Sequence, residues 1–259
     1  MNNFEKEYSL LIKNCCRNGA KIRGRNGNIR QLTAIQVRAN LNQGFPLVTG
    51  KQIFPKSVFT ELEWMLNGFT NVKWLNDRGV KIWDQWADAN GDLGPVYGHQ
   101  ILNFAGVNQL SQISEEFKTT KNSRRLLVSM WNPADLNKMA LPPCHYAFQF
   151  VIENSVADVV VSMRSLDLFI GLPYDIAMYA TLLIAFCQEH NLIPREVVIN
   201  AANGHIYEEH IGAAAVYAGR QKFKLPTVSN IKPLSCYSSN DIEVNNYNYW
   251  PRLKVEVKK

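Results

Sequence analysis

The residues best suited to chemistry lie in one short segment, MALPPCH at positions 139–145. Two prolines fix the backbone ahead of Cys144, and His145 places an imidazole beside the thiol. A pre-set turn that presents a thiol is what nucleophilic catalysis requires, because the thiolate must point at a substrate atom and its pKa must fall toward neutrality. The heptapeptide alone is equally compatible with a structural cysteine buried where a strand begins.

Carboxyl and guanidinium groups supply further candidates. Glu61 lies among aromatic and aliphatic residues of a helical segment. A carboxyl group near apolar neighbours is a candidate general acid or base, although a solvent-facing helix residue is the alternative. An adjacent pair such as Arg124 and Arg125 is usually a solvated turn.

Hydrophobic periodicity indicates the elements that must position these groups. Apolar spacing predicts a helix over residues 4–16 and a second helix that Pro55 opens and Gly68 stops. Residues 176–190 are apolar nearly all round, which predicts a central helix buried on most sides, with Cys187 in the core.

Apolar and β-branched runs predict strands. Residues 126–131 are predicted to be a buried strand, and residues 147–152 are predicted to pair with 159–161 through a polar turn at 153–155. The glycine- and asparagine-rich residues 20–28 are predicted to be a loop. These elements indicate a mixed sheet with helices in a single domain over residues 1–259.

The composition excludes several classes of protein. No uncharged apolar run reaches about 18 residues and the start of the chain is polar and acidic, so we expect a cytoplasmic protein. The five cysteines form no C-x-x-C pair, and no histidine stands at metal-ligand spacing, so neither a disulfide framework nor a metal site is predicted. The net charge of +6 comes from dispersed Lys and Arg, which favours a pocket for anionic ligands over nucleic-acid binding.

The nucleophile segment is one of many motifs that resemble the thymidylate synthases. The matching segments are GFPLVT at 44–49, IWDQWA at 82–87, GDLGPVYG at 91–98, SRR at 123–125, WN at 131–132, KMALPPCH at 138–145, RSLD at 164–167, GLP at 171–173 and HIY at 205–207. They span almost the whole chain in the family's order. The resemblance implies an α+β, thymidylate-synthase-like fold with a mixed twisted sheet, a long buried helix, peripheral helices and a homodimer formed through the sheet.

The resemblance also implies a reaction. In that family the cysteine adds to C6 of a pyrimidine nucleotide, so that C5 becomes an enamine carbon able to attack 5,10-methylenetetrahydrofolate. Cys144 takes this role by resemblance. Glu61, Tyr97 and His145 match the positions that order water and move protons at the ring.

A nucleotide phosphate needs several guanidinium groups, because its oxygens accept bidentate, charge-assisted hydrogen bonds. By resemblance Arg164 and Ser165 belong to the phosphate site. Arg124 and Arg125 match a pair that the family supplies from the opposite subunit, which implies an obligate symmetric homodimer with composite sites.

The rest of the predicted site also comes from the resemblance. Either Arg23 or Arg25 closes over the phosphate, the alignment there being open, and His205 and Tyr207 hold the sugar 3′-hydroxyl. Aromatic faces stack on the flat folate rings and a carboxylate binds the pterin. The predicted folate pocket consists of Ile82, Trp83, Trp86, Asp167, Gly171 and Tyr174, with core packing as the alternative for the two tryptophans.

Asp175 departs from the family's pattern. The synthases carry an Asn here that pairs with N3–H and O4 of uracil. An ionised carboxylate can only accept, so it opposes O4 of uracil, but it can accept from the 4-amino group and a protonated N3 of cytosine. The alternative is a helix N-cap, for which Asp and Asn are equivalent. The phage deoxycytidylate hydroxymethylases, which are relatives with the same fold, carry Asp at this position, which favours cytosine.

The C-terminus departs as well. Residues 247–257 resemble the family's closing tail, but Lys258 and Lys259 stand where the synthases end in small apolar residues. That tail excludes water, so that the exocyclic methylene intermediate receives hydride from tetrahydrofolate. Two lysines are expected to seal poorly and to let water add to the methylene. Met163 and Asn203 stand where the family usually has Gln and often has Asp, which suggests an altered polar network near the base whose effect is left unassigned.

These observations lead to one hypothesis and its alternatives. We expect a deoxycytidylate (dCMP) 5-hydroxymethyltransferase, phage-encoded or not, that uses 5,10-methylenetetrahydrofolate and no metal. The alternatives are a dCMP methyltransferase, a thymidylate synthase that accommodates Asp175, or a hydroxymethylase for dUMP or CMP. A nucleic-acid-binding regulator that retains the fold is the rival from another class, and the presence of Cys144, Arg164 and Glu61 argues against it.

Overall fold

The computed structural model describes residues 3–24 and 26–258. Two residues with predicted roles, Arg25 and Lys259, lie outside the described residues. The helices are α1 (Asn3–Asn18), α2 (Pro55–Leu66), α3 (Lys73–Asn76), α4 (Tyr97–Asn103), α5 (Gln109–Thr119), α6 (Gly171–His190) and α7 (Ile211–Gly219), with short 3-10 turns η1 (Leu41–Gln43), η2 (Leu136–Lys138), η3 (Glu208–His210) and η4 (Leu234–Cys236). The strands are β1 (Ala20–Gly24), β2 (Gly27–Asn40), β3 (Leu127–Ser129), β4 (His145–Glu153), β5 (Val156–Met163), β6 (Leu166–Asp167), β7 (Ile193–Tyr207), β8 (Thr227–Ser229) and β9 (Glu243–Asn245).

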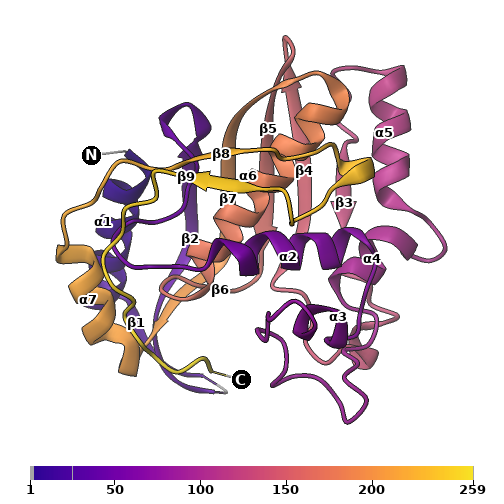
Figure 1. Ribbon diagram of the computed structural model, residues 1–259. Helices are drawn as coiled ribbons and strands as arrows, with labels where there is room; N and C mark the ends of the chain where they lie inside the picture. Colours follow the sequence, from indigo (N-terminus) through magenta and orange to yellow (C-terminus); the bar gives the residue numbers. More distant parts are fainter. Residues whose placement is uncertain (1–2, 25, 259) are drawn as a thin grey trace.

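The first seven strands form one mixed sheet in the described part of the chain. Its order is β1-β2-β7-β5-β4-β3, and β6 pairs with the end of β7. Strand β7 is antiparallel to β2 but parallel to β5 and β6. Figure 1 shows the twisted sheet with α1 and α7 together at its β2 end and α4 and α5 near β3. The predicted α+β fold with a mixed sheet is confirmed.

Helix α6 lies at the centre of the hydrophobic core. It contacts β5, β6 and β7, and α2 packs against it. Most of its side chains are buried, including Cys187, as predicted. The core continues into α1, α2 and α5, so the buried helix organises both the sheet and the peripheral helices. Among the described residues, no helix has the length and apolar character needed to cross a membrane.

The start of α6 differs from the prediction. Asp167 accepts hydrogen bonds from the backbone amides of Phe169 and Ile170, both at 2.8 Å. These bonds satisfy amides just ahead of the helix, which begins at Gly171 rather than at residue 176. Asp175 is therefore inside the helix, and the alternative that it is an N-cap is wrong.

The structure bears out two other local predictions. Pro55 is the first residue of α2, and Gly68 follows the helix with a φ of 70° that favours glycine. Strands β4 and β5 pair antiparallel. They are joined by Asn154 and Ser155, both with positive φ, as in the favoured two-residue hairpin turns.

Two predictions about strands are wrong. The segment 20–28 is a hairpin rather than a loop, because β1 pairs with β2 along its whole length and β7 supports β2 from the other side. Strand β3 is shorter than predicted. Leu127 and Trp131 are exposed, because β3 is at the sheet's edge.

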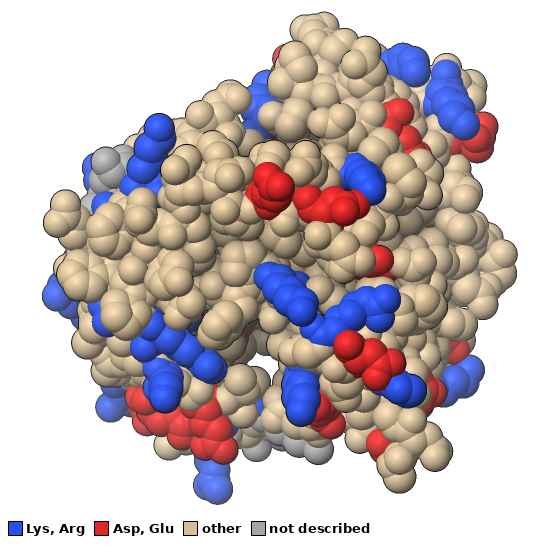
Figure 2. Space-filling view, viewed as in Figure 1, with Lys and Arg blue, Asp and Glu red and all other residues tan. Residues whose placement is uncertain are grey.

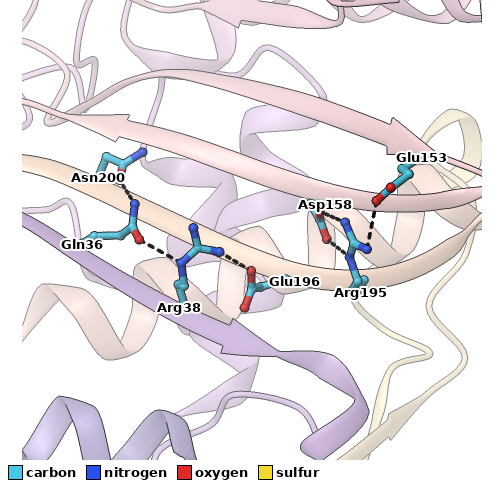
Figure 3. Close-up of polar contacts among 7 residues, drawn as sticks. All are labelled: Gln36, Arg38, Glu153, Asp158, Arg195, Glu196 and Asn200. Carbon is cyan, nitrogen blue, oxygen red and sulfur yellow. Dashed lines mark hydrogen bonds and ion pairs between the residues drawn. The ribbon is translucent and has the colours of Figure 1, made fainter. Parts of the chain in front are cut away.

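The sheet face turned away from the core carries interlinked polar side chains, several of which Figure 3 shows. Arg195 of β7 pairs with Asp158 of β5 at 2.6 Å and with Glu153 of β4 at 3.3 Å. Arg38 of β2 pairs with Glu196 of β7. Opposite charges therefore lie across neighbouring strands, which supports the strand order.

Candidate active site

Contacts to α4 and to the end of β5 hold the loop that carries Cys144. The backbone amide of Cys144 donates to the Tyr97 hydroxyl at 2.9 Å, and the Arg164 amide donates to the Cys144 carbonyl at 2.9 Å. The Arg164 guanidinium donates to the carbonyls of Pro142 and Pro143 at 2.7 and 2.9 Å, and its Nη2 lies 3.7 Å from the Cys144 Sγ. Arg164 therefore positions the turn and places a positive charge beside the sulfur.

The Cys144 thiol is only partly prepared for attack. Burial raises its pKa, the Arg164 charge lowers it, and a negative charge on Asp175 raises it. The net shift of the Cys144 pKa is upward, opposite to the shift that nucleophilic attack requires. Neutralising Asp175 would remove one cause of the increase.

Glu61 is half-buried on α2 and faces the same site. Trp83 Nε1 donates a hydrogen bond to Glu61 Oε1 at 2.8 Å. Burial raises the pKa of Glu61 to about 7, although the Trp83 bond opposes the shift. A carboxyl group that titrates near neutrality suits general acid or base chemistry, and the solvent-facing alternative is wrong.

Asp175 presents a carboxyl group with no hydrogen bond to the described part of the chain. Burial raises its pKa well above the ordinary value, and the negative charges of Glu61 and Asp167 raise it further. A Cβ at Gly171 would lie 3.4 Å from Asp175 Oδ2, so the glycine leaves room beside this carboxyl group. The surroundings of Asp175 therefore favour its neutral form more than bulk water does.

Two tyrosines clamp His145. The Tyr97 ring stacks on the imidazole with centroids 4.3 Å apart, and the Tyr179 hydroxyl lies 2.7 Å from Nδ1. Burial lowers the pKa of His145 to about 3, so the ring is neutral at neutral pH. Tyr179 was not among the predicted site residues, although its position four residues after Asp175 places both on one helix face.

The predicted folate residues gather around α2 and the start of α6. Asp167 uses Oδ1 to hold the helix start, and its Oδ2 has no hydrogen-bond partner among the described residues. Gly171 and Tyr174 follow in the first turn of α6, and Tyr174 is half-buried.

The aromatic part of this pocket is packed more tightly than predicted. Trp83 is 8% exposed, and its ring contacts those of Trp64, Trp86 and Tyr97. Neighbouring rings and the bond to Glu61 therefore cover most of the surface of Trp83, which leaves little of it for a folate ring. Ile82, beside it, is exposed.

The predicted sugar-binding residues lie where β7 ends. His205 Nδ1 lies 3.1 Å from Asn203 Oδ1, and the Tyr207 ring meets His205 edge to face. His205 is also the register partner of Asp167 in the neighbouring strand. The sheet thus brings the predicted sugar and folate contacts side by side.

The predicted phosphate residues are more dispersed. Arg23 lies on the β1–β2 hairpin and lines an open depression with Gly24, Gly27 and Asn28. A Cβ at Gly27 would lie 3.7 Å from the Tyr207 ring, so the hairpin adjoins the predicted sugar site. Figure 2, seen from the same side as Figure 1, shows a hollow in the lower centre of the molecule with Lys and Arg side chains on both sides of it.

The side chains of three further phosphate candidates make no contact with Cys144 among the described residues. Arg124 and Arg125 are exposed, and their guanidinium groups hold no hydrogen bond or ion pair within the described residues. Ser165 is half-buried beside Arg164, and its hydroxyl has no partner in the same part of the chain. Among the described residues, these candidates therefore do not gather into one phosphate site.

The C-terminal tail follows the core and then ends near the predicted sugar site. The Trp250 amide donates to the Thr49 carbonyl at 2.9 Å. Lys258 Nζ pairs with Glu209 Oε1 at 2.6 Å, two residues beyond Tyr207. Lys258 is therefore anchored in the structure, where the sequence predicted a loosely sealing end.

Comparison with protein families gives one result. The sequence model of the thymidylate synthase family matches residues 6–259, nearly the whole chain. Enzymes of this family use methylenetetrahydrofolate. Of the predicted catalytic residues, Tyr97 contacts both Cys144 and His145, and Trp83 links Tyr97 to Glu61. The chain belongs to the thymidylate synthase family and is a folate-dependent one-carbon transferase that acts on pyrimidine nucleotides.

Proposed function

We propose that this enzyme is a deoxycytidylate 5-hydroxymethyltransferase. Cys144 adds to C6 of dCMP, C5 takes the one-carbon unit from 5,10-methylenetetrahydrofolate, and water captures the exocyclic methylene. The observation that carries the proposal is the carboxyl group of Asp175, which has no hydrogen-bond partner among the described residues and whose charge acts on Cys144 as that of Glu61 acts on it.

The protonation of Asp175 refines the argument for cytosine. A neutral acid has one O–H donor and one acceptor oxygen, which match N3 and the 4-amino group of cytosine. When thiolate addition makes N3 more basic, the proton can move along the same hydrogen bond, and the resulting carboxylate still accepts from both groups.

Uracil, in contrast, can pair with only one protonation state of Asp175. A neutral Asp175 can donate to O4 and accept from N3–H, but an ionised Asp175 faces O4 with a second acceptor. Mismatched polar groups in a dry pocket can discriminate by about 10⁴-fold. Cytosine therefore fits both forms of the acid and uracil fits only one.

Residues present in this chain fit a folate. The Oδ2 of Asp167, which has no hydrogen-bond partner among the described residues, can accept from pterin N–H groups. The ring of Tyr174 and the exposed side chain of Ile82 offer apolar surface. A bound folate would supply the one-carbon unit. Lys258 supports hydroxymethylation only in placing a charged side chain where the synthases end in small apolar residues, and its ammonium group pairs with Glu209 Oε1.

We also propose that the enzyme acts as a homodimer through the outer sheet face, with Arg124 and Arg125 reaching the phosphate of the partner's site. The family is usually dimeric. The two guanidinium groups are exposed and have no partner in the described part of the chain. They support this arrangement because such positive charges are available to an anion bound in another subunit.

Thymidylate synthase activity on dUMP is the second candidate. Two observations favour it. The raised pKa of Asp175 favours the neutral acid, which can pair with uracil. The ion pair of Lys258 with Glu209 holds the C-terminal tail in place.

Product analysis separates the two candidates. Purified enzyme is incubated with methylenetetrahydrofolate and either dCMP or dUMP, and the product mass is measured with dihydrofolate absorbance. We expect hydroxymethyl-dCMP without dihydrofolate. Turnover of dUMP alone, with dihydrofolate, would establish the second candidate. Asp175→Asn should shift preference toward dUMP by at least about 100-fold, and unchanged preference would remove the argument from Asp175.

A further inference from the structure

We propose that Tyr179 is a positioning residue that holds His145 as the tautomer protonated on Nε2. The tautomer itself is inferred independently of the proposed function. Only the role of this N–H group in catalysis rests on that function. The pair itself is defined by geometry, with the Tyr179 hydroxyl 2.7 Å from His145 Nδ1 and the two rings nearly perpendicular at 87°.

The assignment follows from the number of protons available. Burial lowers the pKa of His145 to about 3 and raises that of Tyr179 well above its usual value, so both side chains are neutral. A neutral imidazole carries one ring proton, and a tyrosine carries one hydroxyl proton. Only one of them can lie between Nδ1 and the hydroxyl oxygen.

The surroundings decide which proton lies there. The Tyr179 hydroxyl makes no other hydrogen bond within the described residues. If Nδ1–H donated to the hydroxyl, two groups of these buried side chains would lack a partner among the described residues, the tyrosine proton and the Nε2 lone pair, whereas the opposite arrangement leaves only the Nε2–H group without one. The hydroxyl therefore donates to Nδ1, and the ring proton is on Nε2.

The remaining contacts fix the direction of the Nε2–H group. The Tyr97 ring stacks on one face of the imidazole, and Tyr179 is itself held by Phe148 and by its place on α6. Nε2 has no hydrogen-bond partner in the described part of the chain. It is a fixed donor, next in sequence to the nucleophile, available to the pyrimidine ring or to a water bound to it.

A fixed donor stabilises charge that develops during the reaction more than it stabilises the bound substrate. Thiolate addition at C6 moves electron density toward the ring atoms opposite the sulfur, and a pre-oriented N–H group needs no reorganisation to meet it. Loss of the Tyr179 hydroxyl should therefore lower kcat while leaving nucleotide KM nearly unchanged.

The tautomer can be measured directly. Protein labelled with ¹⁵N-histidine is studied by NMR, and His145→Gln assigns the signal among the five histidines. We expect a protonated Nε2 and an unprotonated Nδ1. A protonated Nδ1 in the wild type would overturn the proposal. This measurement needs no substrate, so its outcome is independent of which nucleotide the enzyme uses.

Variants test whether Tyr179 acts through His145. Tyr179→Phe should give a mixture of tautomers and lower kcat about tenfold, whereas Tyr237→Phe removes another buried hydroxyl, bonded to the Phe59 carbonyl, and should change neither. In a His145→Gln background, Tyr179→Phe should cause no further loss of kcat. Additive losses would show that Tyr179 acts structurally and would overturn the proposal.

Discussion

The two halves of the predicted site differ in how far one chain completes them. Around the nucleophile, Cys144, Arg164 and Glu61 already hold hydrogen bonds or charge contacts with neighbouring site residues. Around the predicted phosphate, Arg124 and Arg125 are exposed and have no side-chain partner among the described residues. The contacts around the nucleophile, which include Arg164 of the predicted phosphate site, are thus formed within one chain. Arg124 and Arg125 make no such side-chain contacts among the described residues, as the proposed homodimer would require.

Loss of the nucleophile should have the largest effect. Cys144→Ser should lower kcat at least about 10³-fold, because a hydroxyl is a much weaker nucleophile at neutral pH. Cys236→Ser changes an exposed thiol and should leave the rate unchanged. Substantial turnover by Cys144→Ser would contradict the central role of this residue.

The exposed arginines should act across subunits. Arg125→Ala should raise nucleotide KM about 10- to 100-fold, as expected for loss of a charge-assisted hydrogen bond. Mixing this variant with Cys144→Ser should restore activity, because one site in each mixed dimer receives both the intact cysteine and the intact arginine. Absence of recovery in verified mixed dimers would place Arg125 outside the partner's site.

Salt should distinguish the same two regions. Nucleotide KM should rise with ionic strength, because exposed guanidinium charges are screened. The single-turnover rate at saturating nucleotide should change less, since the contacts around Cys144 are largely buried. If nucleotide KM and the single-turnover rate were equally sensitive to salt, the proposed difference between the two regions would be contradicted. Rates measured at several salt concentrations provide the test.

The buried carboxyl group should make stability depend on pH. The pKa of Glu61 rises from 4.5 to about 7 on folding, so the folded state binds more protons between these values. Stability should therefore fall as pH rises through this range, by up to about 3 kcal/mol. Because the lowered pKa of His145 acts in the opposite direction, the test is the difference between wild type and Glu61→Gln in urea unfolding. A pH-independent difference would exclude the shift.

The tail contact should have the smallest effect. Glu209→Gln removes the partner of Lys258 and should loosen the tail only slightly, since the pair is partly exposed and screened by solvent. Protease cleavage near the C-terminus should become faster, whereas Glu256→Gln, which alters a longer contact of the same lysine, should have little effect. Equal effects of both variants would argue against a specific Glu209 contact.

The sequence predicted more of the fold than of the site's chemistry. Pro55, Gly68 and the apolar run of α6 mark their helices by local rules, and the structure follows them. The hairpin at 20–28 was missed because its strands are stabilised by pairing with β7, far away in the chain. Glycine and asparagine indicate only the reversal at its tip.

The sequence by itself determined the family, through the order of its motifs, and the identity of the groups available for chemistry, Cys144, Glu61 and Asp175 among them. Only the tertiary structure decided their protonation and their partners. Burial beside other acids favours neutral Asp175 and sets Glu61 near neutrality, and helix α6 brings Tyr179 to His145. The physical reason is that desolvation and proton sharing depend on neighbours in space, which spacing along the chain does not specify.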